Sequence, residues 1–188
     1  MTVIALVRHG ETEWNRLGKV QGSSDIPLND TGRAQAAGAA AALRGGEYEL
    51  LVASPLSRAR ETAEIIGSAL GLGAPELVPD LRERGYGDAE GMAVGEWTAL
   101  WPGGAVPGIE PREDVVARSA RALHEIAERA GERPVIAVAH GAVISSLLRA
   151  VSDEQYPLRG ERIGNASQQI LDVTPDGMRV LSYIGVPI

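Results

Sequence analysis

The sequence contains no cysteine, which excludes a disulfide framework, a thiol nucleophile and a thiolate metal ligand. It also has no apolar run approaching the roughly 20 residues that a membrane span needs. The apolar stretch in MTVIALVRHG is short and has no basic segment before it, so it resembles neither a signal peptide nor a span. These absences predict no membrane partner, and the cytoplasm is the expected location.

Positive charge is also scarce, because the formal net charge is -7. The long-range field therefore disfavours non-specific binding to nucleic acid, and a site for phosphate must be a local cationic spot. With 188 residues, 44% of them hydrophobic, the chain fits one globular domain over 1–188. A homodimer is an expectation.

Several phosphate chemistries leave traces that are missing. No G-x-x-x-x-G-K-[ST] loop is present, which excludes a P-loop nucleotide site. No D-x-D pair is present, which argues against a magnesium-dependent aspartyl phosphatase, and the three histidines lack the close spacing of zinc ligands. We therefore expect no metal and no cofactor.

Hydrophobic periodicity predicts alternating strands and helices. Buried strands are expected at 2–7, 49–54 and 134–139, and two further strands at 167–173 and 178–184 around a turn at 175–177. Helices are expected at 31–43, 57–70, 112–130 and 142–150, the first capped by Asp30 or Thr31 and the second ended by Gly71. This order predicts a three-layer α/β/α sandwich with a mostly parallel sheet.

A segment rich in glycine and proline, at about 85–111, lacks strong periodicity and is predicted to be a lid. Its aromatic residues Tyr86, Trp97 and Trp101 either line the way into a site or pack internally. His124 lies inside a predicted helix and is interpreted as a surface or packing residue.

Basic side chains follow three of the predicted strands. His9 follows the first strand, Arg58 the second and His140 the third. Because open parallel sheets bind ligands at the carboxyl ends of their strands, these side chains are expected to meet at one edge. Arg8 precedes His9, and its charge disfavours the imidazolium and keeps the ring available as a nucleophile. Gly10 allows a sharp turn and a close approach of backbone N–H groups to a ligand.

The segment RHGETEWN at a strand end resembles the opening motif of the histidine phosphatase superfamily, also called phosphoglycerate mutase-like. The resemblance implies the phosphoglycerate mutase-like fold and phosphorylation of His9. SPLSRARETA resembles a second family segment, whose register selects Arg58 and not Arg60 as a phosphate ligand. The first turn of a helix also favours an anion there, and a guanidinium can bind phosphate oxygens through two parallel hydrogen bonds.

Two further segments resemble the family. His140 in AVAHGAV corresponds to the second histidine, which binds the transferring phosphoryl group, and Gly141 offers a backbone N–H beside it. Glu83 in LRERGYGDAEG corresponds to the proton donor to the leaving oxygen and later base for water, with Glu90 as its competitor. The resemblance also assigns phosphate or substrate contacts to Asn15, Gln21 and Gly22 and structural roles to Asn165, Ala166 and Ser167.

Three functions remain open at this level. A phosphatase lets water attack phospho-His9, whereas a mutase returns the phosphate to a bound intermediate. Val94 stands where the mutase segment carries a lysine, and no tandem arginine pair follows within 92–111, which favours a phosphatase acting on small phosphomonoesters. A noncatalytic phosphoester-binding module is the third reading. Cations for a second substrate charge are not obvious in the lid, with Arg84 and Arg112 as candidates.

Overall fold

A six-stranded sheet forms the middle layer of the computed structural model, which describes residues 1–188. The strand order is β3-β2-β4-β1-β6-β7. The first four strands in that order are parallel, and β6 and β7 are antiparallel additions at one edge. The strands are β1 (Thr2–Arg8), β2 (Leu50–Ala53), β3 (Glu76–Leu77), β4 (Val135–Ala139), β6 (Gln168–Thr174) and β7 (Gly177–Ser182).

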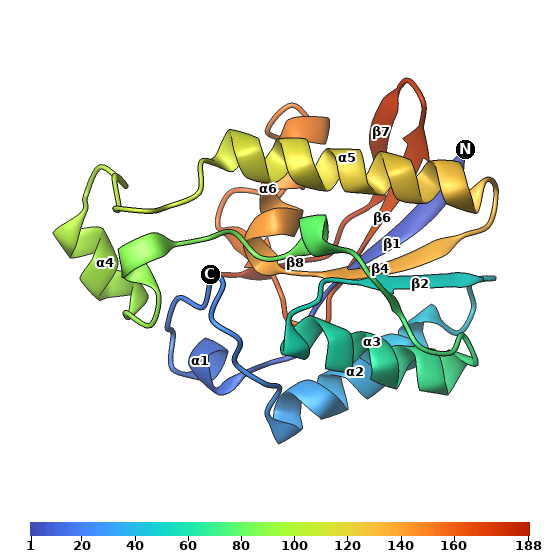
Figure 1. The fold of residues 1–188 in the computed structure, drawn as a ribbon, viewed down its shortest axis with the longest axis horizontal. Helices are drawn as coiled ribbons and strands as arrows, with labels where there is room; N and C mark the ends of the chain where they lie inside the picture. Colours follow the sequence, from blue (N-terminus) through green and yellow to red (C-terminus); the bar gives the residue numbers. More distant parts are fainter.

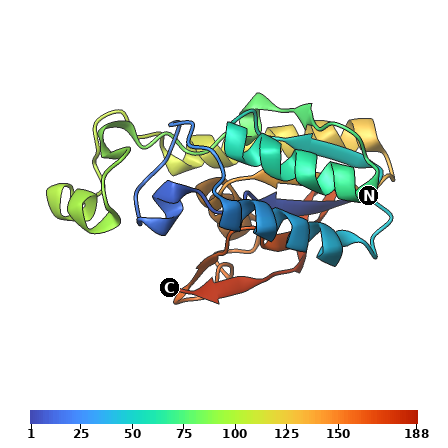
Figure 2. The ribbon, with the colours of Figure 1, turned by 90° about the horizontal axis from the view of Figure 1, so that it is seen from below.

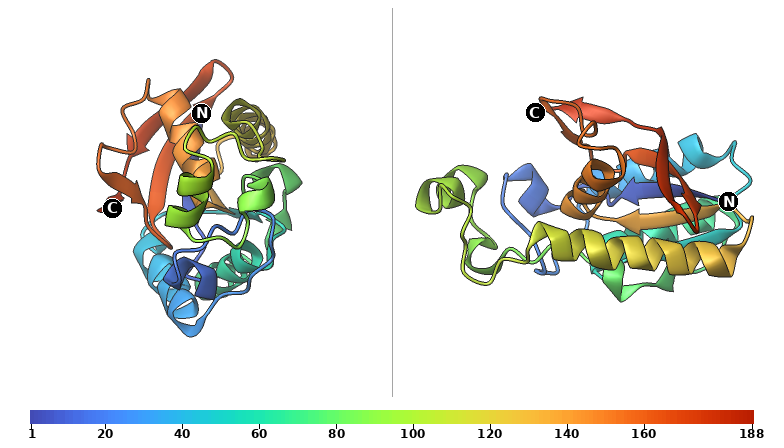
Figure 3. Two further views of the ribbon diagram at one scale, coloured as in Figure 1. Left: turned by 90° about the vertical axis from the view of Figure 1, so that its left-hand side faces the viewer. Right: turned by 90° about the horizontal axis from the view of Figure 1, so that it is seen from above.

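Helices cover both faces of this sheet (Figure 1). One face carries α2 (Asp30–Leu43) and α3 (Ser57–Leu70), which lie side by side in Figure 2. The other carries α5 (Arg112–Ala130) and α6 (Gly141–Val151). Figure 3 shows α5 running along the length of the sheet. The predicted sandwich with a mostly parallel sheet is thus confirmed.

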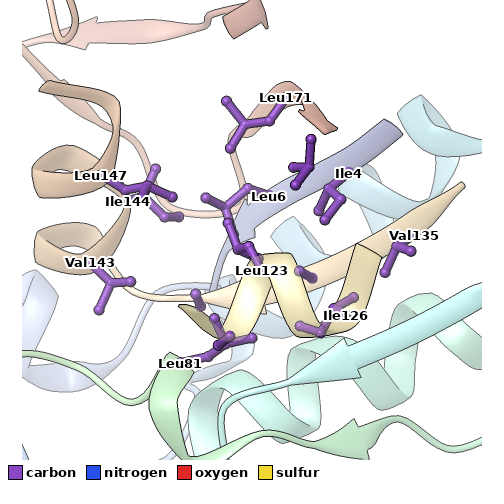
Figure 4. Close-up of a cluster of buried hydrophobic side chains, with 14 of the residues drawn as sticks. Ile4, Leu6, Leu81, Leu123, Ile126, Val135, Val143, Ile144, Leu147 and Leu171 are labelled. Carbon is purple, nitrogen blue, oxygen red and sulfur yellow. The ribbon is translucent and has the colours of Figure 1, made fainter. Parts of the chain in front are cut away.

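Side chains of the central strands alternate between two hydrophobic clusters, as a period of two requires. Ile4 and Leu6 of β1 face α5 and α6, where they meet Leu123 and Ile144 (Figure 4). Ala5 and Val7 face α2 and α3 on the opposite side. The strands are buried on both faces, which explains their continuous apolar sequence.

The predicted helix ends need one correction. The N-cap of α2 is Asn29, not Asp30 or Thr31, because the Asn29 side chain accepts the Gly32 N–H at 2.8 Å. Gly71 does end α3, with a φ of 75° in the left-handed region.

Short elements escaped the sequence analysis. They are α1 (Glu13–Arg16), a two-stranded sheet of β5 (Glu161–Ile163) and β8 (Gly185–Pro187), and 3₁₀ turns at Pro79–Leu81 and Gly87–Ala89. The lid segment also contains a helix, α4 (Val94–Leu100). Both α1 and α4 lie at the same end of the molecule, on the left in Figures 1 and 2. No helix combines the length and apolar character that crossing a membrane demands.

The revised cap of α2 is testable by substitution. We expect Asn29→Ala to lower the free energy of unfolding by about 1 kcal/mol, because the Gly32 N–H loses its acceptor. Thr31→Ala is the matched control, since the exposed Thr31 side chain makes no hydrogen bond. Urea denaturation of both variants measures the difference, and an equal loss in both would contradict the assignment.

Candidate active site

The carboxyl ends of β1, β2 and β4 converge because these strands are direct neighbours and run parallel. His9 follows β1 and His140 follows β4, and their ring centroids are 5.1 Å apart. Arg58 lies in the first turn of α3, shortly after β2. The expected meeting of these three side chains at one edge is therefore what the structure shows.

The His9 ring is held in one tautomer. Its Nδ1 lies 2.6 Å from the carbonyl oxygen of Gly10, and a carbonyl can only accept a hydrogen bond. Nδ1 therefore carries the proton in the neutral ring, which leaves the lone pair on Nε2. His9 also lines the main cavity of the molecule. Nε2 is therefore the ring nitrogen of His9 whose lone pair is available for reaction.

Both buried imidazoles are kept neutral. Burial is the largest cause that holds the pKa of His9 well below its ordinary value, and the charges of Arg8 and Arg58 lower it further. The pKa of His140 is also well below its ordinary value, through burial first and then through Arg58, His9 and Arg8. These mutual effects place all four groups within electrostatic reach of one another.

Gly10 has a role other than the predicted one. Its N–H donates to Thr62 Oγ1 at 3.0 Å, so it does not face a ligand, and its φ is not in the left-handed region. Glycine is required because a Cβ atom there would lie 2.3 Å from the carbonyl oxygen of Gly32 in α2. This close contact and Thr62 fix the loop that carries His9.

Each of the two guanidinium groups keeps one buried donor without a protein partner. Arg8 donates from Nη1 to the Ile163 carbonyl at 2.6 Å, and its Nε is enclosed and unpartnered. Arg58 is fully buried and donates to the carbonyl oxygens of Ser24 and Gly22 at 2.8 and 2.9 Å, again leaving Nε unpartnered. Burial lowers the pKa of Arg8 to about 10, which still leaves it cationic at neutral pH.

The loop that receives Arg58 is stabilised by Glu90. Its carboxylate accepts the N–H groups of Ser23, Ser24 and Tyr86 at 2.8, 3.0 and 3.1 Å, and the Ser24 hydroxyl at 2.8 Å. Burial raises the pKa of Glu90, but these hydrogen bonds outweigh it and bring the pKa below its usual value. Glu90 thus has a structural position, and it is absent from the cavity wall that Glu83 helps to form.

Ser54 contacts the second histidine and was missed by the sequence analysis. Its Oγ lies 2.7 Å from His140 Nε2 and also accepts the Leu56 N–H at 3.3 Å. The Ser54 hydroxyl can donate to Nε2, and in that tautomer the ring proton lies on Nδ1. His140 Nδ1 is the third buried site atom without a partner. The only available signal was the serine that opens SPLSRARETA.

Glu83 lies across from the N-terminus of α6. Its carboxylate oxygens accept the N–H groups of Ala142 and Val143 at 3.3 and 3.2 Å, and that of Arg84 at 3.0 Å. The free N–H groups of a helix start favour a carboxylate there. The junction between β4 and α6 therefore positions both His140, which is the N-cap of α6, and Glu83, which accepts N–H groups of its first turn.

A partly buried ion pair, which the sequence analysis also missed, holds the loop of Glu83. Arg118 of α5 binds Glu110 through two hydrogen bonds of 2.7 and 3.0 Å and donates to the Asp80, Arg82 and Glu83 carbonyls at 2.7, 2.7 and 3.2 Å. Burial raises the pKa of Glu110, but Arg118 and the Gly85 N–H bring it below its usual value. No local sequence pattern links residues 83, 110 and 118.

A cavity of about 410 Å³ lies over the strand ends. The predicted residues on its wall are Arg8, His9, Asn15, Gln21, Gly22, Glu83 and Gly141. Arg58 and His140 are fully buried and do not form part of that wall.

Among the minor contacts, Asn15 Oδ1 accepts from Asn165, whose amide also donates to the His9 carbonyl, both at 3.1 Å. Asn165 therefore bridges two site segments. Gln21 Oε1 accepts from Thr12 at 2.8 Å, which leaves the Gln21 Nε2 donor without a protein partner.

The lid aromatics differ in position. Tyr86 lines the cavity, whereas Trp97 packs edge-on against Tyr86 with centroids 6.4 Å apart, and neither Trp97 nor Trp101 reaches the wall. His124 lies on α5 outside the site. Arg60 is exposed and lies 3.5 Å from Glu64, as expected of a solvated helix arginine. No group of three potential metal-ligating side chains is present.

Comparison with known proteins identifies the family of this chain. The sequence model of the histidine phosphatase superfamily (branch 1) matches residues 4–184. A protein of Bacillus subtilis described as the uncharacterized phosphatase PhoE is 39% identical over 183 residues, which cover 97% of this chain and 94% of that protein.

Two solved structures share the fold over nearly the whole chain. A mycobacterial glucosyl-3-phosphoglycerate phosphatase, in complex with VO3, has a TM-score of 0.83 and 32% identity, with 96% of this chain and 98% of the other covered. Phosphoserine phosphatase from Entamoeba histolytica, in complex with 3-phosphoglyceric acid, has a TM-score of 0.80 and 26% identity, with 97% and 96% covered. Small phosphorylated ligands thus bind relatives of this protein.

The depressed histidine pKa values predict how stability changes with pH. Below about pH 6.5 the unfolded chain takes up a proton on each imidazole, whereas folded His9 and His140 stay neutral. Each ring then lowers the free energy of unfolding by up to about 1.4 kcal/mol per pH unit as the pH falls.

We expect His9→Asn and His140→Asn each to make this dependence shallower by roughly 1 kcal/mol per unit between about pH 6 and 5. Urea denaturation in phosphate-free buffer checks this, because a bound anion would stabilise the folded state. If the free energy of unfolding changed with pH equally in both variants and the parent, the rings would take up protons in the folded state as well.

Proposed function

Since the chain belongs to branch 1 of the histidine phosphatase superfamily and is a phosphatase, we propose that it hydrolyses small phosphomonoesters through a phosphohistidine on His9. One observation carries this proposal. Arg8 Nε, Arg58 Nε and His140 Nδ1 are buried nitrogen atoms without protein partners. Arg8 and Arg58 act electrostatically on His9, and the His140 ring centroid lies 5.1 Å from that of His9. Buried donors are normally satisfied, and a phosphoryl group supplies the acceptors.

In the first step the three donors hold the non-bridging oxygens of the phosphoryl group. Nε2 of His9 forms a bond to phosphorus in line with the leaving oxygen, whose bond to phosphorus breaks. Glu83, on the same cavity wall, gives its proton to that oxygen and releases a neutral alcohol.

In the second step water attacks the phosphorus of phospho-His9 and gives a proton to Glu83. The bond between phosphorus and Nε2 breaks, inorganic phosphate forms, and His9 returns to the neutral ring with its proton on Nδ1. The Gly10 carbonyl stabilises the positive charge that Nδ1–H carries while Nε2 is phosphorylated. Donors fixed by burial need no reorganisation as charge develops, which is where this arrangement accelerates the reaction.

The lid favours hydrolysis over phosphoryl return. Val94 lines the cavity and is half exposed, so an apolar side chain stands where a mutase segment carries a lysine. A cofactor-dependent mutase is the second candidate. It predicts little release of phosphate but interconversion of phosphoglycerates once 2,3-bisphosphoglycerate is added. A binding module predicts neither reaction, with phosphate binding retained.

The role of His9 is tested by a labelled phosphoenzyme. We expect His9→Ala to reduce turnover of p-nitrophenyl phosphate by more than about 10⁴-fold, because the nucleophile is lost, and to give no acid-labile labelled protein on rapid quench. His124→Ala is the matched control and is expected to keep activity, since His124 lies outside the cavity. Both assays contain EDTA, so that turnover in the parent also tests independence of metal.

A labelled phosphoenzyme recovered from His9→Ala would contradict the proposal. Circular dichroism and urea denaturation establish that the variant is folded before its inactivity is interpreted.

The acid role of Glu83 predicts a dependence on the leaving group. Glu83→Gln is expected to slow hydrolysis of an alkyl phosphate by about 10²–10⁴-fold and that of p-nitrophenyl phosphate much less, because nitrophenolate leaves without a proton. Glu90→Gln serves as the neighbouring comparison and is expected to slow both esters alike. Steady-state kcat/KM for the two esters measures the ratio, because it reports the step in which the leaving alcohol departs and not the later hydrolysis of phospho-His9, which both esters share. Equal slowing of both kcat/KM values by Glu83→Gln would count against the acid role.

A further inference from the structure

The cavity carries more positive charge than one phosphoryl group uses. Five basic and two acidic side chains line it, in a chain whose net charge is -7. They are Arg8, Lys19, Arg112, Arg149 and Arg162 on one side and Glu83 and Glu161 on the other. Of the five, only Arg8 belongs to the proposed phosphoryl clamp. The remaining cations therefore call for a separate explanation.

Three of these cations have no carboxylate partner. Arg149 is already paired, at 3.1 Å, with Glu154. Lys19, Arg112 and Arg162 form no ion pair, and all three are exposed at the cavity. The Lys19 ammonium group lies 5.9 Å from the ring centroid of Trp14, which leaves its hydrogen bonds unused.

The carboxylates nearby do not neutralise these groups. Glu161 lines the same wall, but its Oε2 accepts the Tyr183 hydroxyl at 3.0 Å and neither oxygen lies in an ion pair. Glu83 is bound by the N–H groups at the start of α6. Both carboxylates therefore form hydrogen bonds elsewhere, and the three cations remain available to an anion that enters the cavity.

The β5–β8 sheet places Arg162 beside the phosphoryl clamp. Arg162 pairs with Val186 in the register of the two strands. The next residue, Ile163, accepts the Arg8 hydrogen bond at 2.6 Å. Arg162 is also among the charges that lower the pKa of Arg8, after burial itself. A group held by Arg162 would consequently lie a short distance from the phosphoryl group.

Arg112 and Lys19 reach the cavity from other segments. Arg112 is the first residue of α5, and its charge opposes the burial-driven rise in the pKa of Tyr86, which also lines the wall. Lys19 follows α1 and forms a bridge with Ala93 at the base of the lid. The three cations thus come from parts of the chain far apart in sequence and surround one small space of about 410 Å³.

We propose that Arg162, with Arg112 and Lys19, binds a second anionic group of the substrate. The substrate class is then a small phosphomonoester that carries a carboxylate or a second phosphate a few bonds from the scissile group. This inference rests on the proposed hydrolysis at His9. It differs from the lid-based expectation, because the cations come from β5, α5 and the loop after α1. Of the two candidates in the sequence, Arg112 lines the cavity, whereas Arg84 donates to the Glu110 carbonyl and does not.

Matched substrates test the proposal. In the first pair, 3-phosphoglycerate carries a carboxylate where glycerol 3-phosphate carries a hydroxymethyl group. In the second pair, propane-1,3-diol bisphosphate carries a second phosphate that its monophosphate lacks. In at least one pair, we expect kcat/KM of the parent to be about tenfold or more higher for the substrate that carries the second anionic group. A hydrogen bond to a charged group contributes enough free energy for such a difference. The pair that shows the preference distinguishes carboxylate from phosphate. Assays at high salt screen long-range steering, which does not need a bound contact.

Variants assign the preference to residues. Arg162→Gln is expected to lower the ratio of kcat/KM values within the favoured pair by about tenfold, mainly through KM. Arg112→Gln and Lys19→Gln are expected to lower it by smaller factors. Arg44→Gln is the control, because Arg44 is an exposed arginine at the end of α2, without an ion pair and outside the cavity. It should leave the ratio at the parent value.

Two failures are distinguishable. If the parent hydrolyses all esters and the ratio of kcat/KM values within each pair is near one, the second-anion inference is overturned and the proposed hydrolysis stands. The inference is also overturned if Arg162→Gln, Arg112→Gln and Lys19→Gln all leave the ratio of the favoured pair unchanged. If no ester were hydrolysed, including p-nitrophenyl phosphate, the proposed function would fall. Calorimetric binding of 3-phosphoglycerate against glycerol 3-phosphate would then test the subsite alone, and equal affinities would overturn it.

Discussion

Two imidazoles and two guanidinium groups share one buried volume, and this crowding of basic groups is the constraint on which the rest of the structure depends. Like charges repel strongly where water is excluded, so such a cluster is tolerated only if some members are neutral and the others find acceptors. Burial keeps His9 and His140 uncharged, while backbone carbonyls receive Arg8 and Arg58. Three buried nitrogen atoms of this cluster, Arg8 Nε, Arg58 Nε and His140 Nδ1, remain without a protein partner and are suited to bind an anion.

The supporting residues can be understood from that constraint. The carbonyl oxygens that receive Arg58 belong to a loop that has no regular structure, and Glu90 fixes it by accepting several of its N–H groups. Arg118 and Glu110 perform a similar task for the loop of Glu83. Partners of this kind hold reacting groups within the small tolerances that catalysis needs. The loops at the strand ends are therefore as closely specified as the sheet.

Charge decides what reaches this cluster. The protein as a whole is acidic, so an anion is drawn only to the cavity, where basic side chains outnumber acidic ones. The phosphoryl group and any second anionic group of a substrate would meet different cations. The three nitrogen atoms proposed to hold the phosphoryl group are buried, whereas the Lys19, Arg112 and Arg162 side chains are exposed and free to adjust. In the proposed function, this division would separate the groups that act in hydrolysis from those that select the substrate.

The sequence by itself determined the layers, the main helices and strands, and the placing of His9, Arg58 and His140 at one edge of the sheet. It could do so because apolar periodicity and strand ends are local properties, and because parallel neighbours must end at the same side. Only the tertiary structure decided that Ser54 contacts His140, that Arg118 binds Glu110, and that Arg162 lies beside Arg8 on a two-stranded sheet too short to show a pattern. Ser54 and His140 are 86 positions apart in the sequence, Arg8 and the Ile163 carbonyl that it binds are 155 apart, and Glu110 and Arg118, although only 8 apart, belong to different elements. A linear pattern carries no information about which of such side chains meet.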